Sequence, residues 1–246
     1  MGNNWISNYL DAMNVTFYPE THTYINDTTQ EKYISCTTLL SKYKKPFDVD
    51  GHSKRIARRE GVSQQFILDS WKDAADQGHL KGNTYHKIME NFIKDNTVES
   101  GYEDLIDNFA KKTAGIIINT SNVMSEQLLV LHDYRVAGTA DLIVENKQNF
   151  AIFDFKTNKK FNFTSKYNEF LLEPVDYLTN CEFTVYALQL SLYAYMFEMK
   201  TGKKCASLKT FYLRDFSAKF WQEINIPYMK DSIEKLLNHY REQTSK

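Results

Sequence analysis

The chain has few cysteines and no pattern that would pair them. Its 246 residues include 3 cysteines, and these lie far apart without a Cys-x-x-Cys motif. This spacing argues against a disulfide framework, a four-cysteine zinc site and an iron–sulfur cluster. We therefore expect Cys36, Cys181 and Cys205 to be buried free thiols in a reducing compartment.

The sequence also lacks a signal for export or for a membrane. Its N-terminus has no basic region followed by an apolar stretch, so we expect no signal peptide. Met1-Gly2 would suit N-myristoylation, but position six holds Ile6 where serine or threonine is required. No apolar run approaches the length of a membrane span. The expectation is a soluble cytoplasmic protein without a membrane partner.

The chain has almost no net charge. The formal value is −1, so the overall field does not attract a polyanion, and a protein of this kind must bind a phosphate backbone through local basic patches. Basic clusters are usually solvated surfaces, but aromatic residues that could stack on bases follow one of them. The clusters are Lys42–Lys45, Lys54-Arg55 with Arg58-Arg59, and Lys156 with Lys159-Lys160, the last followed by Phe161, Phe163 and Tyr167.

Hydrophobic periodicity and turn residues predict one mixed α/β (α+β) domain over residues 1–246, with a β and helical extension (1–80) before the core (81–246). Residues 15–34 favour a β-hairpin or a three-stranded unit, and a short helix opens near Thr37. Further helices are predicted at 53–60, 63–77, 83–94, 102–118, 182–199 and 228–242, with Gly61 and Gly78 as C-terminal caps, and strands at 123–132, 135–145, 150–156, 206–214 and 218–226.

The strongest functional signal lies between Gly138 and Lys156. Asp141 enters one apolar, β-branched run and Asp154 ends another, where it shares a strand face with Lys156. Two carboxylates beside a lysine in an apolar sheet are costly unless something neutralises them, and oxygen ligands suit Mg²⁺ or Mn²⁺. Lys156 would then stabilise charge developing on a phosphate and orient or deprotonate a water. Either aspartate alone fits a turn or a surface strand as well.

Further candidates are weaker on the residues alone. His86 and Glu90 are four apart and share a helix face, although a lone helical histidine is usually structural. Gln189 and Tyr193 share the face of an apolar helix, where the amide either serves a site or is simply satisfied in the core. Glu126 opens the strand before the first aspartate and faces either the same cleft or solvent. These alternatives stay open at this point.

Together, these motifs resemble the PD-(D/E)XK nuclease superfamily, and most of all its RecB-like exonuclease branch. The resemblance covers roughly residues 80–215. Each motif alone is weak, but their occurrence together in the family order is a fairly specific match. The N-terminal run also resembles phage-encoded exonucleases of this branch. The motifs are Gly82…His86, then Asp141…Asp154-Phe155-Lys156, then Gln189…Tyr193, with Phe17-Tyr18-Pro19 and His22-Thr23-Tyr24 in the N-terminal run.

The resemblance implies a restriction-endonuclease-like core, which is a mixed sheet with helices on both sides. It also implies metal-dependent hydrolysis of phosphodiesters by water, without a covalent intermediate. The expected roles are metal binding by His86, Asp141, Asp154 and the Phe155 carbonyl, catalysis by Lys156 with Asp141, Asp154 and Glu126, and DNA or cleft contacts from Gln189, Tyr193, Glu90, Lys159 and Lys160.

The departures from the family pattern are small. Ala140 stands where the family name has proline, three cysteines cannot supply the four-cysteine cluster of some relatives, and no Walker A motif is present. We expect a phage-encoded, Mg²⁺- or Mn²⁺-dependent DNA exonuclease of replication, recombination or repair that acts on DNA ends. A single-strand annealing or binding protein is a second expected partner. A flap or junction endonuclease, a non-catalytic DNA-binding or virion protein on this scaffold, and a nuclease of RNA stay open.

Overall fold

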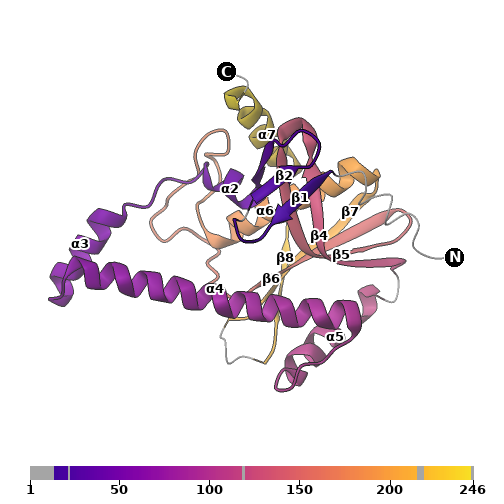
Figure 1. Cartoon of the computed structure of the whole chain (residues 1–246), viewed down its shortest axis with the longest axis horizontal. Helices are drawn as coiled ribbons and strands as arrows, with labels where there is room; N and C mark the ends of the chain where they lie inside the picture. Colours follow the sequence, from indigo (N-terminus) through magenta and orange to yellow (C-terminus); the bar gives the residue numbers. More distant parts are fainter. Residues whose placement is uncertain (1–13, 22, 118–119, 215–218, 245–246) are drawn as a thin grey trace.

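The computed structural model describes residues 14–21, 23–117, 120–214 and 219–244. They form a mixed sheet flanked by helices, with strand order β1-β2-β3-β5-β6-β7-β8 and with β4 paired to β5 (Figure 1). The expected α/β (α+β) class with a central mixed sheet is confirmed. The strands are β1 Val15–Tyr18, β2 Thr23–Asn26, β3 Lys32–Ser35, β4 Asn122–Leu131, β5 Val136–Glu145, β6 Asn149–Lys156, β7 Lys204–Tyr212 and β8 Gln222–Ile226.

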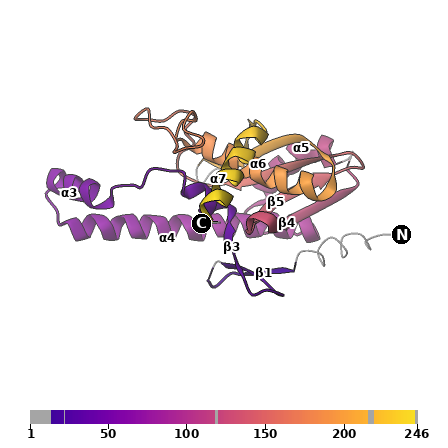
Figure 2. The ribbon, with the colours of Figure 1, turned by 90° about the horizontal axis from the view of Figure 1, so that it is seen from above.

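Helices cover both faces of the sheet. None of them, within the part of the chain that the structure describes, is long and apolar enough to cross a membrane. Figure 2 shows that α3 and the first half of α4 project from the body, so that this part of the chain forms an arm. The helices are α2 Cys36–Ser41, α3 Val49–Glu60, α4 Gln64–Asp95, α5 Glu103–Ile117, α6 Glu182–Thr201 and α7 Lys230–Thr244, with a short 3-10 turn, η1, at His132–Tyr134.

The long helix α4 corrects two sequence predictions. Gly61 does end α3 in the left-handed conformation. Gly78 does not end a helix, because it lies inside α4, which is 32 residues long. The helices predicted at 63–77 and 83–94 are therefore one. Ser63 caps the N-terminus through its side chain, and Asn96 ends the helix in the left-handed region. An interior glycine weakens a helix by only about 0.5–1 kcal/mol, which these caps and the packing of the C-terminal half outweigh.

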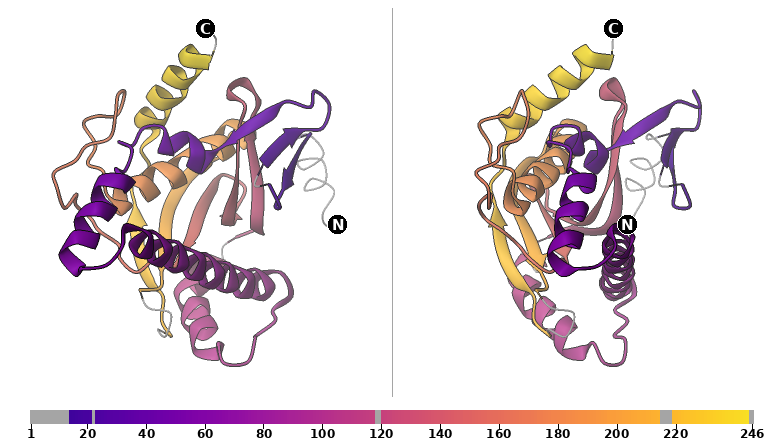
Figure 3. Two further views of the ribbon diagram at one scale, coloured as in Figure 1. Left: turned by 60° about the vertical axis from the view of Figure 1, so that its left-hand side comes forward. Right: turned by 90° about the vertical axis from the view of Figure 1, so that its left-hand side faces the viewer.

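The N-terminal strands form the three-stranded alternative. β1, β2 and β3 pair antiparallel in succession, and β3 then pairs parallel with the start of β5. Figure 3 shows these indigo strands at one end of the sheet and the yellow β8 at the other. The strand predicted at 218–226 begins only at Gln222 in the structure, and residues 215–218 lie outside the described chain.

One edge of β5 is divided between two partners. β3 pairs with it at Val136 and Ala137, and β6 pairs with it only from Leu142 onward. Among the described strand pairs, the stretch 138–141 therefore has a partner on the β4 side alone. The motif that the sequence singled out thus sits where β5 and β6 diverge, and this opening gives access to the sheet from the cleft.

The pleat of both β4 and β5 is interrupted beside this opening. Met124 and Leu129 of β4 are an odd number of residues apart yet pack into the same core, on the α6 side, and Ala140 and Ile143 of β5 do likewise. In a regular strand such residues face opposite sides of the sheet. The interruption on β4 coincides with Glu126, whose φ of 48° lies in the left-handed region. On both strands the regular alternation of side chains between the two faces of the sheet is therefore broken at this point.

Gly138 is required by close packing at the start of the opening. A Cβ at this position would lie 2.7 Å from Cys36 Sγ and 2.7 Å from Tyr193 Cε1. We predict that Gly138→Ala lowers the free energy of unfolding by about 1–3 kcal/mol, because α2 and α6 must move apart. Urea denaturation measures this. The control is Gly115→Ala in α5, where nothing lies within 4 Å of the added carbon and the helix should gain stability. Equal effects of the two substitutions would contradict the packing argument.

Candidate metal centre in the cleft

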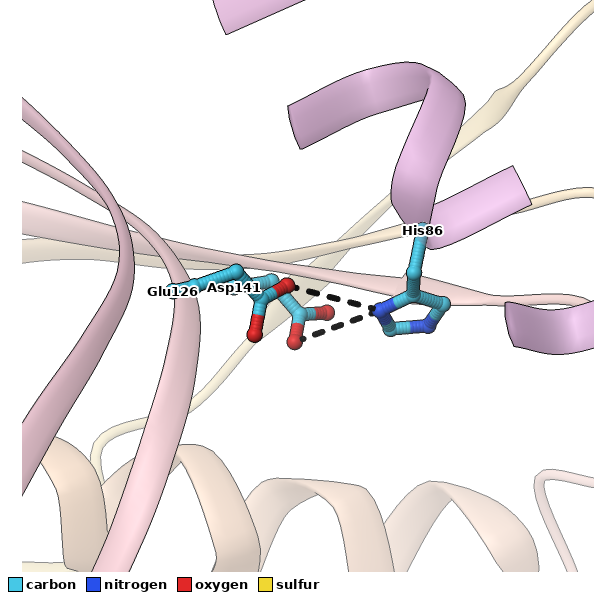
Figure 4. A group of neighbouring side chains, drawn as sticks. All are labelled: His86, Glu126 and Asp141. Atoms are coloured by element: carbon cyan, nitrogen blue, oxygen red, sulfur yellow. Dashed lines mark ion pairs between the residues drawn. The ribbon is translucent and has the colours of Figure 1, made fainter. Parts of the chain in front are cut away.

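Three side chains from three different elements converge at the opening. His86 comes from α4, Glu126 from β4 and Asp141 from β5, and one ligand atom of each lies within 4.8 Å of the others (Figure 4). His86 Nδ1 is 3.6 Å from Asp141 Oδ1 and 4.0 Å from Glu126 Oε1. An imidazole and two carboxylates at this separation are a donor set that divalent ions such as Mn²⁺ accept.

Glu126 reaches the site because of its backbone. Ser125 pairs with Leu142 and Gln127 with Ala140, so Glu126 lies opposite Asp141 on the neighbouring strand. Two carboxylates in directly opposite positions repel each other. Left-handed backbone at a glutamate within a strand is also unfavourable, and such strain concentrates at functional sites. The local geometry is therefore explained better by a ligand that binds both carboxylates than by packing.

Phe155 contributes its main chain rather than its side chain. Its N–H donates to Asp141 Oδ2 at 2.7 Å, and its carbonyl oxygen lies 3.0 Å from His86 Nε2. The last β5–β6 pair is Leu142 with Phe153. Beyond it, the side chains of Asp141 and His86 take the place of a neighbouring strand as partners of the Phe155 main chain. His86 therefore turns Nε2 to this carbonyl and Nδ1 to Asp141 and Glu126, and a hydrogen bond from Nε2 would leave Nδ1 as the metal-binding nitrogen. The expected carbonyl ligand thus lies beside the ring nitrogen that does not face the carboxylates.

Asp154 and Lys156 form a buried pair on the same strand face. Asp154 is 1% exposed, and Lys156 Nζ lies 2.7 Å from its carboxylate. The ammonium donates a hydrogen bond to Oδ1, and it also lies 2.7 Å from Oδ2, where the contact is an ion pair without hydrogen-bond geometry. Burial raises the pKa of Asp154 above its usual range, against the opposing effect of Lys156. Both oxygens of this buried carboxylate therefore face one ammonium, and a metal ion that bound Asp154 would have to share this contact.

The donor set differs slightly from the expected one. The three groups that lie closest are His86, Glu126 and Asp141, whereas Asp154 is not a member of this trio and is held by Lys156. Glu126, expected only as an acidic position near catalysis, therefore joins the candidate ligands. Asp154 stays a candidate because its Oδ2 accepts no hydrogen bond from the described residues, although Lys156 Nζ lies 2.7 Å from it. The Phe155 carbonyl stays a candidate beside Nε2, the ring nitrogen that does not face the two carboxylates.

Charge is balanced within the site by His86 and Lys156. Burial opposes the charge on His86, but the facing carboxylates, chiefly Asp141 and then Glu126, raise the pKa of the imidazole to about 9. Burial likewise disfavours the ammonium of Lys156, and Asp154 and Asp141 outweigh it and raise its pKa. At neutral pH both groups are therefore cationic without a metal. In the metal-free site Lys156 therefore serves as a hydrogen-bond donor and a positive charge.

The site opens into a cleft of about 1620 Å³ between α4 and the strand edges. Tyr193, Lys159 and Glu90 line this cleft, as expected, although the Glu90 carboxylate is held by Lys87 and Lys94. Two expected cleft residues are not part of its lining. Gln189 is buried and donates its amide to the Tyr193 hydroxyl at 3.1 Å, and Lys160 is exposed on the following loop.

One residue that lines the cleft was not foreseen. Tyr186 presents its ring to Lys156, whose Nζ lies 5.0 Å from the ring centroid. Such an arrangement stabilises an ammonium without neutralising it. Tyr186 precedes Gln189 by three residues and Tyr193 by seven on α6, so helical spacing already placed the three on one face. This helical spacing is the signal in the sequence that could have identified Tyr186.

Comparison with known proteins yields weak similarity only. No protein-family profile and no curated protein matches the chain. Among solved structures, SSO0001 is 15% identical, with a TM-score of 0.37, and the match covers 99% of this chain and 88% of that one. The "Putative exonuclease" of Eubacterium rectale is 12% identical, with a TM-score of 0.40, and the match covers 87% of this chain and 79% of the other.

We predict that Mn²⁺ stabilises the protein against thermal unfolding, since it relieves repulsion among the carboxylates. At a concentration one hundred times its Kd the gain is about 2.7 kcal/mol. Asp141→Asn and Glu126→Gln should each remove most of this gain. The control, Glu90→Gln, alters a cleft carboxylate that neighbouring lysines hold, and should leave the gain intact. Equal loss in all three variants would show that the metal does not bind at the proposed centre.

The raised pKa of His86 predicts a pH dependence of metal binding. Below its pKa of about 9 the imidazole carries a proton that an incoming ion must displace. The affinity for Mn²⁺ should therefore increase between about pH 7 and about pH 8.5, by up to tenfold per unit. Calorimetry in buffers of different ionisation enthalpy measures the released proton. In the His86→Asn variant the pH dependence of Mn²⁺ affinity should disappear. If this pH dependence persists in the variant, His86 is not the group whose proton the metal displaces.

Proposed function

We propose that this chain is a metal-dependent nuclease that hydrolyses phosphodiester bonds in DNA, built on the PD-(D/E)XK scaffold of the RecB-like branch. The observation that supports this best is the convergence of His86, Glu126 and Asp141 beside the buried Asp154–Lys156 pair. These groups come from one helix and three strands, and three of them, His86, Glu126 and Lys156, line an open cleft. Packing alone gives no reason to gather three carboxylates, an imidazole and an ammonium there.

The residues present fit Mg²⁺ or Mn²⁺. Asp141 and Glu126 would provide carboxylate oxygens and His86 would provide Nδ1. Asp154, which Lys156 holds, and the Phe155 carbonyl, which lies beside Nε2, are further candidates. When bound, such an ion lowers the pKa of a coordinated water and stabilises the charge that develops on the phosphate oxygens. The cleft has no cysteine cluster that would hold iron and sulfur, since among the described residues Cys36, Cys181 and Cys205 are free and separate.

Lys156 supplies the second half of the chemistry. Its raised pKa keeps it protonated at neutral pH, so it would donate a hydrogen bond to a non-bridging phosphate oxygen. Asp154 holds the ammonium from one side and Tyr186 from another. The alternative role considered from the sequence, removal of a proton from water by Lys156, would require a neutral amine.

Cleavage from DNA ends is the finer part of the proposal. Lys159 extends the positive charge of Lys156 along the cleft, and a loop with exposed aromatic residues follows it. This combination suits a single strand, whose backbone needs cations and whose bases need stacking surfaces. We propose an exonuclease of DNA replication, recombination or repair, encoded by a phage. A flap or junction endonuclease is the second candidate, and a single-strand annealing or binding protein stays a predicted partner.

We predict that Asp154→Ala and Lys156→Ala each reduce cleavage by at least about 10²-fold, because each removes stabilisation of the transition state. The assay follows end-labelled linear duplex, single-stranded and covalently closed circular DNA with Mg²⁺ and with EDTA. Lys111→Ala, an exposed lysine on α5, is the matched control.

An exonuclease spares the closed circle and releases short products, whereas an endonuclease opens the circle. Wild-type rates in Asp154→Ala or Lys156→Ala, or cleavage that survives EDTA, would refute the proposed mechanism.

A further inference from the structure

A second, smaller hollow adjoins the cleft. It has a volume of about 280 Å³ and is formed by the loop after β6, the first turns of α6 and Lys44. Tyr186 lines both hollows, and Lys156 Nζ lies 5.0 Å from the centroid of its ring. The small pocket and the proposed catalytic lysine are therefore neighbours of the same aromatic ring.

The lining of this pocket is polar and aromatic but carries no net charge. Lys44 and Lys166 are offset by Glu169 and Glu182. A site for a free phosphate would carry an excess of cations, so the balance disfavours an anion. Two amides, Asn162 and Asn180, line the same pocket together with two tyrosines. Amides and aromatic rings recognise a nucleobase, through its hydrogen-bonding edge and its flat faces.

We propose that this pocket binds the base of the unpaired nucleotide next to the scissile phosphate. The proposal rests on the proposed function, because it takes Lys156 as the marker of the scissile position. The volume, just below the range of sites for drug-sized ligands, suits one nucleotide. A base must leave its helix to enter, which favours single-stranded or frayed ends over intact duplex.

Tyr167 is the residue that makes the proposal testable. It lines the pocket, and its side chain is 71% exposed, so truncation removes a stacking surface without disturbing the core. Lys166 Nζ lies 5.3 Å from the centre of its ring, which places a cation at the same wall. Phe220 is a matched control, since it is 62% exposed and lines neither hollow.

The experiment is a binding cycle that involves no cleavage. A fluorescein-labelled single strand of about 12 nucleotides, long enough for such a groove, is titrated in EDTA and followed by anisotropy. An abasic site is moved along the strand one position at a time. We expect one position to weaken binding about 5- to 100-fold, the range for loss of one stacked base. Tyr167→Ala should weaken binding of the intact strand similarly, but add little once that base is absent.

Two results would overturn the proposal. One is a strand whose affinity is insensitive to the abasic site at every position. The other is a loss of affinity in Tyr167→Ala that is just as large for the strand with the abasic site as for the intact strand. A loss of the same size in Phe220→Ala would count against the proposal in the same way. Asn162→Ala provides a second variant, whose loss should also vanish with the abasic strand. Because binding is measured without metal, failure of this cycle is distinct from failure of the nuclease assay, in which wild-type protein would not cleave DNA at all.

Discussion

The separation of β5 from β6 beyond the Leu142–Phe153 pair is the constraint on which the site depends. Diverging strands leave main-chain groups without ladder partners, and such groups must be satisfied when they are buried. At Phe155 the carboxylate of Asp141 accepts from the N–H, and the imidazole of His86 meets the carbonyl. The side chains that complete the hydrogen bonding of the sheet are therefore the same ones that gather at the candidate metal centre. The same residues therefore form the open strand edge and the candidate metal centre.

Gathering so many charged groups costs stability. Asp154 is buried with one carboxylate oxygen that receives no hydrogen bond among the described residues, and Glu126 adopts a backbone conformation that is unfavourable by about 1–3 kcal/mol. His86 and Lys156 offset part of this as cations, and a bound ion would offset more. Such costs are typical of functional sites and difficult to explain as packing.

Much of this arrangement follows from short-range sequence patterns. The rest depends on packing, on local backbone irregularity and on contacts between residues far apart in the sequence. The three central strands and the apolar helix α6 were predictable because their periodicity is strong, and Asp141, Asp154 and Lys156 were placed by their strands. The break expected at Gly78 was wrong, since caps and packing decide where a helix ends more than one glycine does. Whether Glu126 faced the cleft or solvent depended on an irregular φ that no periodicity encodes. The pocket beside Tyr186 brings Lys44 to residues more than one hundred positions away, so it had no local signal.

The helix α4 has a mechanical consequence. It is continuous from its cap at Ser63 to Asn96, and it carries His86 in the half that packs on the sheet while its other half projects with α3. Gly78 and Gly82 lie inside this helix, between its first turns and His86, and glycine is the residue that most weakens a helix interior apart from proline. A bend of α4 at these positions would separate movement of the arm from the position of the imidazole. The same helix thus carries both the arm and a candidate metal ligand.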